Sequence, residues 1–199
     1  MELARHPQLF PVLAGLSGFY NVRGEQTIAR ELGEKLLRLA ENAQDQALLR
    51  TGHTTLGIAL NYLGEAPAAC AHFQQGLAGR NPQRPSPSGI SCLAQLAHVL
   101  WRLGYPDQAM SRAHEALVEA RQLSLPFWVG YAMHFTTVLH SDRREEWAAQ
   151  EQAEIVIALS TEHGFPFWLG WATLLRGRVL AVQGQSEAGI RQIHEGLDI

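Results

Sequence analysis

The chain repeats itself at an offset of 40 residues, and this internal repeat constrains the fold more than any other feature of its 199 residues. One column of the repeat is glycine in four of five positions: Gly24, Gly64, Gly104, Arg144 and Gly184. A second column, five positions later, holds Ala29, Ala69, Ala109, Ala149 and Gly189. A third, seven positions before the glycine, holds Ser17, Gly57, Ala97, Thr137 and Gly177. Residues this small allow two backbones to approach closely.

Apolar residues occupy two further columns of the same repeat, four positions before the glycine and thirteen after it. Their members are Tyr20, Leu60, Leu100, His140 and Leu180, and then Leu37, Leu77, Leu117, Ile157 and Leu197. His140 apart, both columns have the character of a buried core. A unit of this length cannot bury its own apolar face, so it has to stack on its neighbours in an elongated array.

The glycine column predicts a turn between two helices in each unit, because glycine takes the left-handed conformation after a helix at little cost. Proline near a helix start fits the same pattern, since its missing amide hydrogen is no loss there. Pro67 and Pro106 open second helices in this way, and Pro126 and Pro166 open first helices. The predicted helices span residues 9–23, 26–42, 45–63, 66–78, 89–103, 106–123, 127–141, 145–162, 167–183 and 186–197.

No stretch alternates between apolar and polar residues in the manner of a strand, so the expected fold is all-α. We expect one domain, residues 1–199, built as a right-handed solenoid of about five helix-turn-helix units. The units span about 9–42, 45–78, 89–123, 127–162 and 167–197. The proline-rich stretch from Gly79 to Gly89 is expected to be an exposed loop. A linker between two domains is the alternative, but the repeat register passes through this stretch undisturbed.

Several motifs resemble those of known repeat proteins. The spacing of Leu56-Gly57, Tyr62, Gly64, Ala69, Phe73 and Leu77 resembles the tetratricopeptide signature, whose usual period is about 34 residues. Longer helices account for the longer period here. Three runs are similar to the C-terminal repeat region of bacterial signalling proteins: Leu9 to Leu13, Leu100 to Ala109, and Glu162 to Phe165. Those proteins join a class III adenylate or guanylate cyclase domain, or a kinase domain, to a signal-transduction ATPase and then to the repeat array.

The resemblance covers essentially the whole chain and implies a regulatory, sensory arm that binds proteins within a signalling ATPase-cyclase system. Nothing in the sequence resembles the cyclase or ATPase domains, so no catalytic residue carries over. The family also has a longer segment with His and Asp where this chain has the short loop from Arg80 to Gly89. The partner would be a protein or peptide, including covalently linked ATPase or cyclase domains. A free-standing adaptor is the first alternative, and an all-helical enzyme is the second.

The charge balance does not indicate a basic surface that would bind nucleic acid or an anionic membrane. The net charge is -3 and the isoelectric point is near 6.3, with no long run of Lys or Arg. No apolar stretch reaches the roughly 20 residues that a bilayer span needs. Cys70 and Cys92 each lie within an apolar helical pattern, so small buried thiols in a reducing, cytoplasmic setting are expected.

No cofactor, metal site or catalytic group is predicted. The nine histidines form no HExxH motif and no close pair on one helical face. Glu145 and Glu146 are adjacent, and adjacent residues on a helix point about 100° apart, so they do not make a pair of cooperating carboxylates. The sequence therefore favours binding over catalysis.

In tetratricopeptide arrays the first helix of each unit lines a concave groove. The inward positions of that fold carry over to Asn21, Thr54, Asn61, Tyr62, His98, Trp101, Arg102, Tyr131, His134, Trp171 and Arg178. Aromatic residues recur here at helical spacing in two successive units: Trp128 and Tyr131, then Trp168 and Trp171. Such a surface could hold an extended peptide or a helix, with the aromatic residues as anchors. The alternative is that any one of these residues only packs against its neighbours or faces water.

The two ends of the sequence predict an excerpt from a longer array. The last predicted helix carries Ile190, Ile193 and Leu197, and no polar closing helix follows, although solenoids need terminal repeats with a polar outer face. Met1 to Arg5 has the pattern of the tail of a preceding second helix. Because exposed apolar faces associate, we expect this chain to self-associate through its last helix.

Overall fold

The structure, a computed structural model, describes residues 8–199 and contains ten helices and no strand over that range. Both ends of every helix lie within two residues of the predicted bounds, and the all-α prediction is confirmed. None of these helices is long and apolar enough to cross a membrane. The helix tail expected at Met1 to Arg5 lies outside the described residues. The helices are α2 (Leu9–Val22), α3 (Gln26–Ala43), α4 (Gln46–Tyr62), α5 (Ala66–Gly76), α6 (Pro87–Arg102), α7 (Pro106–Leu123), α8 (Pro126–Asp142), α9 (Glu146–His163), α10 (Pro166–Val182) and α11 (Ser186–Asp198).

The turn inside each unit has the conformation that the glycine column predicts. The backbone φ angles of Gly64 and Gly104 are 85° and 86°, in the left-handed region. Arg144, the one bulky member of the column, takes the same conformation with a φ of 60°. In every unit, the amide that follows the column residue donates to the carbonyl five residues earlier, as Glu65 does to Leu60 across 2.9 Å. The fourth turn is therefore built like the others.

Small residues bring the two helices of the last unit into close contact. A Cβ atom added at Gly177 of α10 would lie 2.7 Å from the carbonyl oxygen of Gly189 in α11, which is too close for any side chain. Ile193, predicted to lie on an exposed face, packs against Gly177 at this contact instead. Leu197, predicted to lie in a core column, is 67% exposed because no described helix packs beyond α11.

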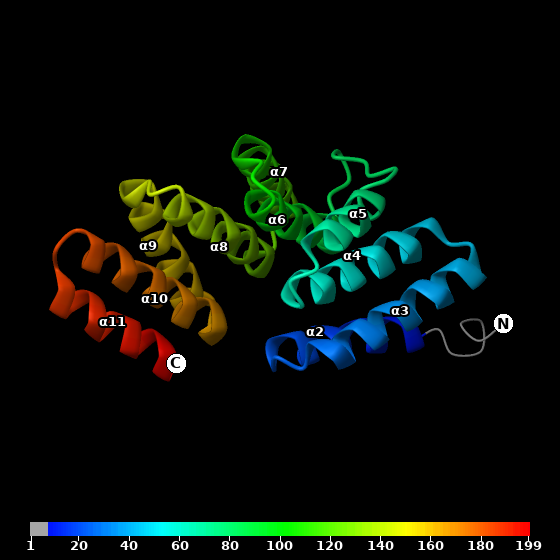
Figure 1. Ribbon diagram of the computed structural model, residues 1–199, viewed down its shortest axis with the longest axis horizontal. Coiled ribbons are helices and arrows are strands. Elements are labelled where there is room, and N and C mark those ends of the chain that lie inside the picture. The colour runs from blue at the N-terminus through cyan, green and yellow to red at the C-terminus, as the bar shows by residue number, and fades with distance from the viewer. Residues whose placement is uncertain (1–7) are drawn as a thin grey trace.

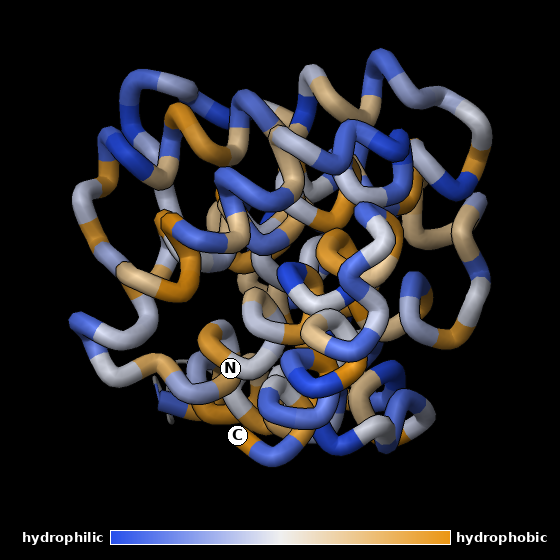
Figure 2. Tube along the Cα trace, turned by 90° about the vertical axis from the view of Figure 1, so that its left-hand side faces the viewer, coloured by the Kyte–Doolittle hydropathy of each residue, from blue (hydrophilic) through white to orange (hydrophobic). Residues whose placement is uncertain are grey.

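Successive units follow one another along an arc, with α5, α7 and α11 on its outer side (Figure 1). Each first helix from α2 to α8 contacts the first helix of the next unit, and each second helix packs against the first helix that follows it. The helices α4, α6, α8 and α10 thus form one continuous inner surface. Hydrophilic residues gather at the turns along the rim, and hydrophobic residues recur along the helices (Figure 2).

The buried core is distributed along the array in three clusters. One surrounds Phe10 and Leu36 in the first unit, the second surrounds Phe73 and Leu96, and the third surrounds Phe135. This spread is the one expected of stacked repeats, in which each unit buries its apolar face against its neighbours.

The proline-rich loop is shorter than the sequence predicts, and most of its residues are exposed, as expected. Helix α6 already begins at Pro87, because Ser86 caps it by accepting a hydrogen bond from the amide of Gly89 across 3.2 Å. The Arg80 side chain is only 19% exposed, since its guanidinium pairs with Glu115 at 2.9 Å and with the buried Glu119. The loop is therefore shorter because of the Ser86 cap, and Arg80 is less exposed than its neighbours because its two carboxylate partners lie on α7.

Candidate functional site

The first helices α4 and α6 border a cleft of about 650 Å³, together with the loop of residues 79–86. We term it the inner cleft. Helix α4 contributes one of its faces, since its lining residues recur at intervals of three and four from Ala47 to Ile58. Helix α6 contributes its first turns, from Pro87 to Ser91, and Trp128 of α8 also lines the cleft. The repeat thus brings most of α4 and the starts of α6 and α8 to one hollow.

A chain of hydrogen bonds joins three first helices next to the inner cleft. Arg102 of α6 donates to the side-chain oxygen of Asn61 in α4 across 2.6 Å. Asn61 donates in turn to Gln95 across 3.0 Å, and Gln95 donates to the Tyr131 hydroxyl of α8 across 3.1 Å. The Tyr131 hydroxyl also lies 3.1 Å from the Ser91 hydroxyl. Burial raises the pKa of Tyr131, so this group stays a neutral hydroxyl that can both donate and accept.

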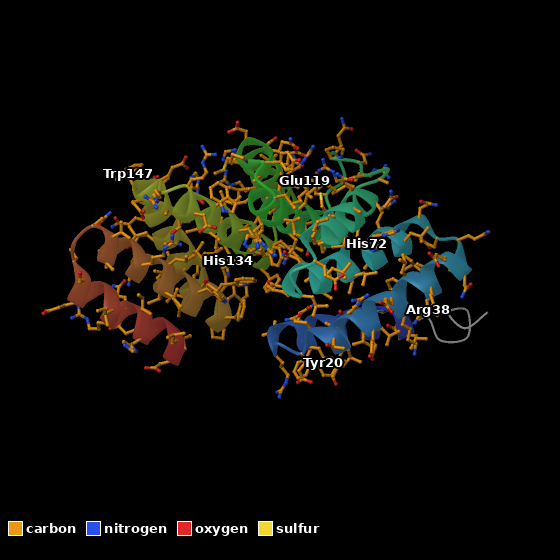
Figure 3. All side chains as sticks on the ribbon, viewed as in Figure 1. Tyr20, Arg38, His72, Glu119, His134 and Trp147 are labelled. Atoms are coloured by element: carbon orange, nitrogen blue, oxygen red, sulfur yellow. The ribbon has the colours of Figure 1, made fainter. Side chains whose placement is uncertain are left out.

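An aromatic cluster continues the inner surface from α8 to α10. The ring of His134 lies 5.2 Å from the rings of both Trp168 and Trp171, measured between centroids. Burial, and then the neighbouring His98, lowers the pKa of His134 to about 3, so the imidazole is neutral at physiological pH. Figure 3 shows His134 on the inner side of the arc and Glu119 toward its outer side. His134 is therefore part of an aromatic wall and does not serve as a charged group.

The sequence-predicted groove residues divide by burial into three sets. Thr54 and Asn61 are buried, at 4% and 1% exposure. The exposed members are Tyr62, Arg102, Trp171 and Arg178. The half-buried members are Asn21, His98, Trp101, Tyr131 and His134.

The same residues also divide by what they contact. Asn61, Arg102 and Tyr131 meet in the hydrogen-bond chain, and His134 and Trp171 meet in the aromatic cluster. Thr54 is the one predicted groove residue that lines the inner cleft. Arg178 lies apart on α10, where it donates to the Ser141 carbonyl across 3.4 Å. Asn21 lies apart on α2, in the first unit.

Sequence reasoning missed the charged lining of the inner cleft. Arg50 of α4, together with Arg80 and Arg84 of the loop, lines it, and no Asp or Glu does. Arg80 is paired with Glu115 and Glu119. Within residues 8–199, neither Arg50 nor Arg84 lies in an ion pair. The repeat could have revealed Arg50, which lies four residues before Thr54 on the same helical face.

A histidine pair between α4 and α5 was also missed. The Nδ1 atoms of His53 and His72 lie 2.9 Å apart, so one ring donates and the other accepts. Burial lowers the pKa of both groups, which matches the neutral state that this hydrogen bond requires. Sequence spacing reveals pairs within one helix, whereas these two residues lie on different helices. In the part of the chain that the structure describes, no three potential ligands come together to hold a metal ion.

Comparison with known families gives a match to the tetratricopeptide repeat. Its family model matches residues 90–115 and 170–195. The first match falls on α6 and α7 and the second on α10 and α11, so the two lie two repeat periods apart. A comparison with curated proteins gives no significant match.

Solved structures share the fold at low sequence identity. BtubC from P. vanneervenii is 17% identical, with a TM-score of 0.74 over 98% of this chain and 83% of that one. A Rap protein complexed with competence and sporulation factor is 13% identical, with a TM-score of 0.83 over 95% of this chain and 53% of that one. YrrB, described as a tetratricopeptide protein with an unusual peptide-binding site, is 15% identical, with a TM-score of 0.51 over 99% and 89%. The chain therefore has the fold of a tetratricopeptide-repeat solenoid.

Proposed function

We propose that this chain is a protein-interaction module that holds a peptide segment of a partner protein in its inner cleft. The observation that carries the proposal is the cleft itself, which is bordered by consecutive first helices and has room for several side chains. The hydrogen-bond chain from Arg102 to Tyr131 holds those helices in register. A preformed surface of this kind limits the entropy that binding would cost.

Two of the structural neighbours support this proposal by analogy. The Rap protein was solved with competence and sporulation factor bound, and YrrB is described by its peptide-binding site. Both share with this chain a stack of helix pairs. The analogy concerns the fold alone, so the character of the ligand has to come from the residues of this chain.

The sequence motifs favour a regulatory arm of a bacterial signalling ATPase-cyclase as the setting for this module. A free-standing adaptor uses the same cleft in the same way, and the geometry of the cleft is consistent with both. The lining of the inner cleft holds no Asp or Glu, so this cleft does not offer the two facing carboxylates that would favour an all-helical enzyme.

Selection from a random peptide display library tests the proposal. The intact chain should enrich peptides that share a sequence pattern. Thr55 lines the inner cleft on α4, so Thr55→Trp should fill the cleft and abolish binding of the enriched peptides. Thr161→Trp is the matched control, because Thr161 is exposed on α9, away from the cleft. Enriched peptides that bind the Thr55→Trp variant as tightly as the unchanged chain would show that the cleft is not the binding site.

A further inference from the structure

We infer that the inner cleft selects an acidic peptide segment, one in which Asp or Glu side chains engage Arg50 and Arg84. This inference rests on the proposed function and adds the chemistry of the ligand. The first observation that supports it is the difference between the net charge of the chain and the charge of the cleft lining. The chain as a whole carries a net charge of -3, whereas the lining of the cleft contains three arginines and no carboxylate. The cleft is thus locally positive on an acidic protein.

The three arginines do not have the same role. Arg80 already has two carboxylate partners, Glu115 and Glu119, and the latter is buried. Its charge is neutralised within the protein, and its contribution is to hold the loop of residues 79–86 against α7. Arg50 and Arg84 are in no ion pair among the described residues. They are the two cations of the cleft that a ligand can neutralise.

The positions of these two residues suit a ligand that lies in the cleft. Arg50 projects from the cleft-lining face of α4, and Arg84 belongs to the loop that leads into α6. The ion pairs of Arg80 already hold the loop against α7. Binding of a ligand by Arg84 therefore costs little further conformational entropy of the loop. A guanidinium binds a carboxylate through two parallel hydrogen bonds, which gives direction as well as affinity.

The remaining lining fits the body of a peptide better than a bare anion. Thr55 and Ser88 add hydroxyl groups that can bond to a peptide backbone, and Ile58 and Trp128 add apolar surface for side chains between the acidic ones. The mixture of two unpaired cations, hydroxyls and apolar walls points to a peptide that alternates acidic and small apolar residues.

The test uses a fluorescently labelled peptide with blocked ends that alternates Glu with Ala, and its counterpart with Gln in place of Glu. Fluorescence anisotropy should show binding of the Glu peptide, at least about tenfold weaker binding of the Gln peptide, and weakening with added salt. The double variant Arg50→Gln with Arg84→Gln should lose at least about tenfold in affinity for the Glu peptide. The matched control, Arg38→Gln with Arg191→Gln, removes the same charge from exposed positions on α3 and α11 and should keep the affinity within about twofold.

Three results would overturn the inference. They are equal affinity of the chain for the Glu and Gln peptides, unchanged affinity in the Arg50 and Arg84 double variant, and clearly tighter binding when phosphoserine replaces Glu, which would indicate a phosphopeptide site. Library selection separates this failure from failure of the proposed function. If enriched peptides are neutral and Thr55→Trp still abolishes their binding, the cleft binds peptides but not acidic ones. If no peptide is enriched, both proposals fail.

Discussion

Arg102 and Asn61 lie 41 residues apart in sequence, and the Arg102 guanidinium donates to both the side-chain oxygen of Asn61, at 2.6 Å, and its backbone carbonyl, at 3.0 Å. The carbonyl belongs to the last turn of α4 and also accepts the backbone amide of Gly64 across 3.1 Å. Arg102 of α6 thus adds a second donor at the end of α4. This contact couples the two units directly.

The buried position of Asn61 makes its contribution to stability measurable. Asn61→Ala removes the side-chain acceptor for Arg102 and the donor for Gln95 at a site with 1% exposure. We expect a loss of about 1–3 kcal/mol in the free energy of unfolding, because the groups left behind stay partly buried without partners. Urea denaturation measures it. Gln74→Ala, on the exposed face of α5, is the control and should change stability by less than about 0.5 kcal/mol. Equal midpoints for both variants would contradict the role of the hydrogen-bond chain.

The repeat register made most of the backbone predictable. A small residue at one position of each unit fixes where two helices meet, and the glycine column fixes where the chain reverses. Arg144 shows how strong this register is, because a bulky residue takes the left-handed conformation where the neighbouring units have glycine. The helix bounds follow from such local signals, and local signals are what a single sequence contains.

The side-chain partners were less predictable, because they depend on how helices are rotated against one another. Arg80 and Glu119 lie 39 residues apart, and nothing in the sequence indicates that they meet. His53 and His72 lie on two helices, and their contact depends on the crossing of α4 and α5. The charged lining of the inner cleft was missed for the same reason, since Arg84 reaches it from an irregular loop. Leu197 illustrates the opposite case, because it belongs to a core column of the repeat and yet is exposed, with no described helix packed beyond α11.

Arg144 gives a second prediction. Its φ of 60° is a conformation that glycine adopts at less cost, so Arg144→Gly should be neutral or stabilising. The reciprocal change, Gly64→Arg, should cost on the order of 1 kcal/mol. The cost at Gly64 is conformational, because a Cβ atom there would meet no other atom within 4 Å. Denaturant midpoints should therefore rank Gly64→Arg below the unchanged chain and Arg144→Gly at or above it, and the reverse ranking contradicts this account of the turn.

The buried ion pair of Arg80 gives a third prediction. Arg80→Ala leaves the carboxylate of Glu119 buried at 3% exposure without its cation, which should cost about 3–5 kcal/mol of stability. Replacing Glu119 by Gln in the same chain removes the stranded charge and should recover part of the loss. A double-mutant cycle by thermal and urea denaturation measures the coupling. Arg84→Ala, in the same loop but outside any described ion pair, is the control. Additive effects of the Arg80 and Glu119 changes would show that the pair is not coupled.

The neutral histidines give a fourth prediction, a loss of stability in acid. The folded-state pKa of His134 is about 3, well below the usual value of 6.5. Between about pH 3 and pH 6.5, this histidine therefore binds a proton in the unfolded chain but not in the folded chain. Stability should therefore be full above about pH 6.5 and should fall as the pH falls toward 3. His134→Phe should flatten the dependence of the urea midpoint on pH, while His114→Phe, at an exposed position, should leave the slope unchanged. A smaller slope should remain in His134→Phe, because burial also lowers the pKa values of His53, His72 and His98.

The last prediction is that the chain self-associates through its end helices. On α11, Ile190 and Leu197 are exposed, and on α2 the side chains of Val12, Leu16 and Phe19 are exposed along one face. One repeat period after Val12 and Leu16, the equivalent residues of α4 are Gly52 and Leu56, and both pack against α3. On α4 these positions are covered by α3, the second helix of the preceding unit, whereas on α2 the equivalent positions are exposed.

A second copy of the chain can cover these faces, with α11 of one molecule against α2 of another, and such head-to-tail contacts extend from molecule to molecule. Light scattering should show an average mass that rises with concentration. Ile190→Lys with Leu197→Lys should return the chain to a monomer, because two charges on α11 would have to be buried in the contact. Val118→Lys with Ile155→Lys, at exposed apolar positions on α7 and α9, is the matched control and should leave association unchanged. A chain that stays monomeric at all concentrations, or an α11 variant that associates as strongly as the unchanged chain, would rule out association through this helix.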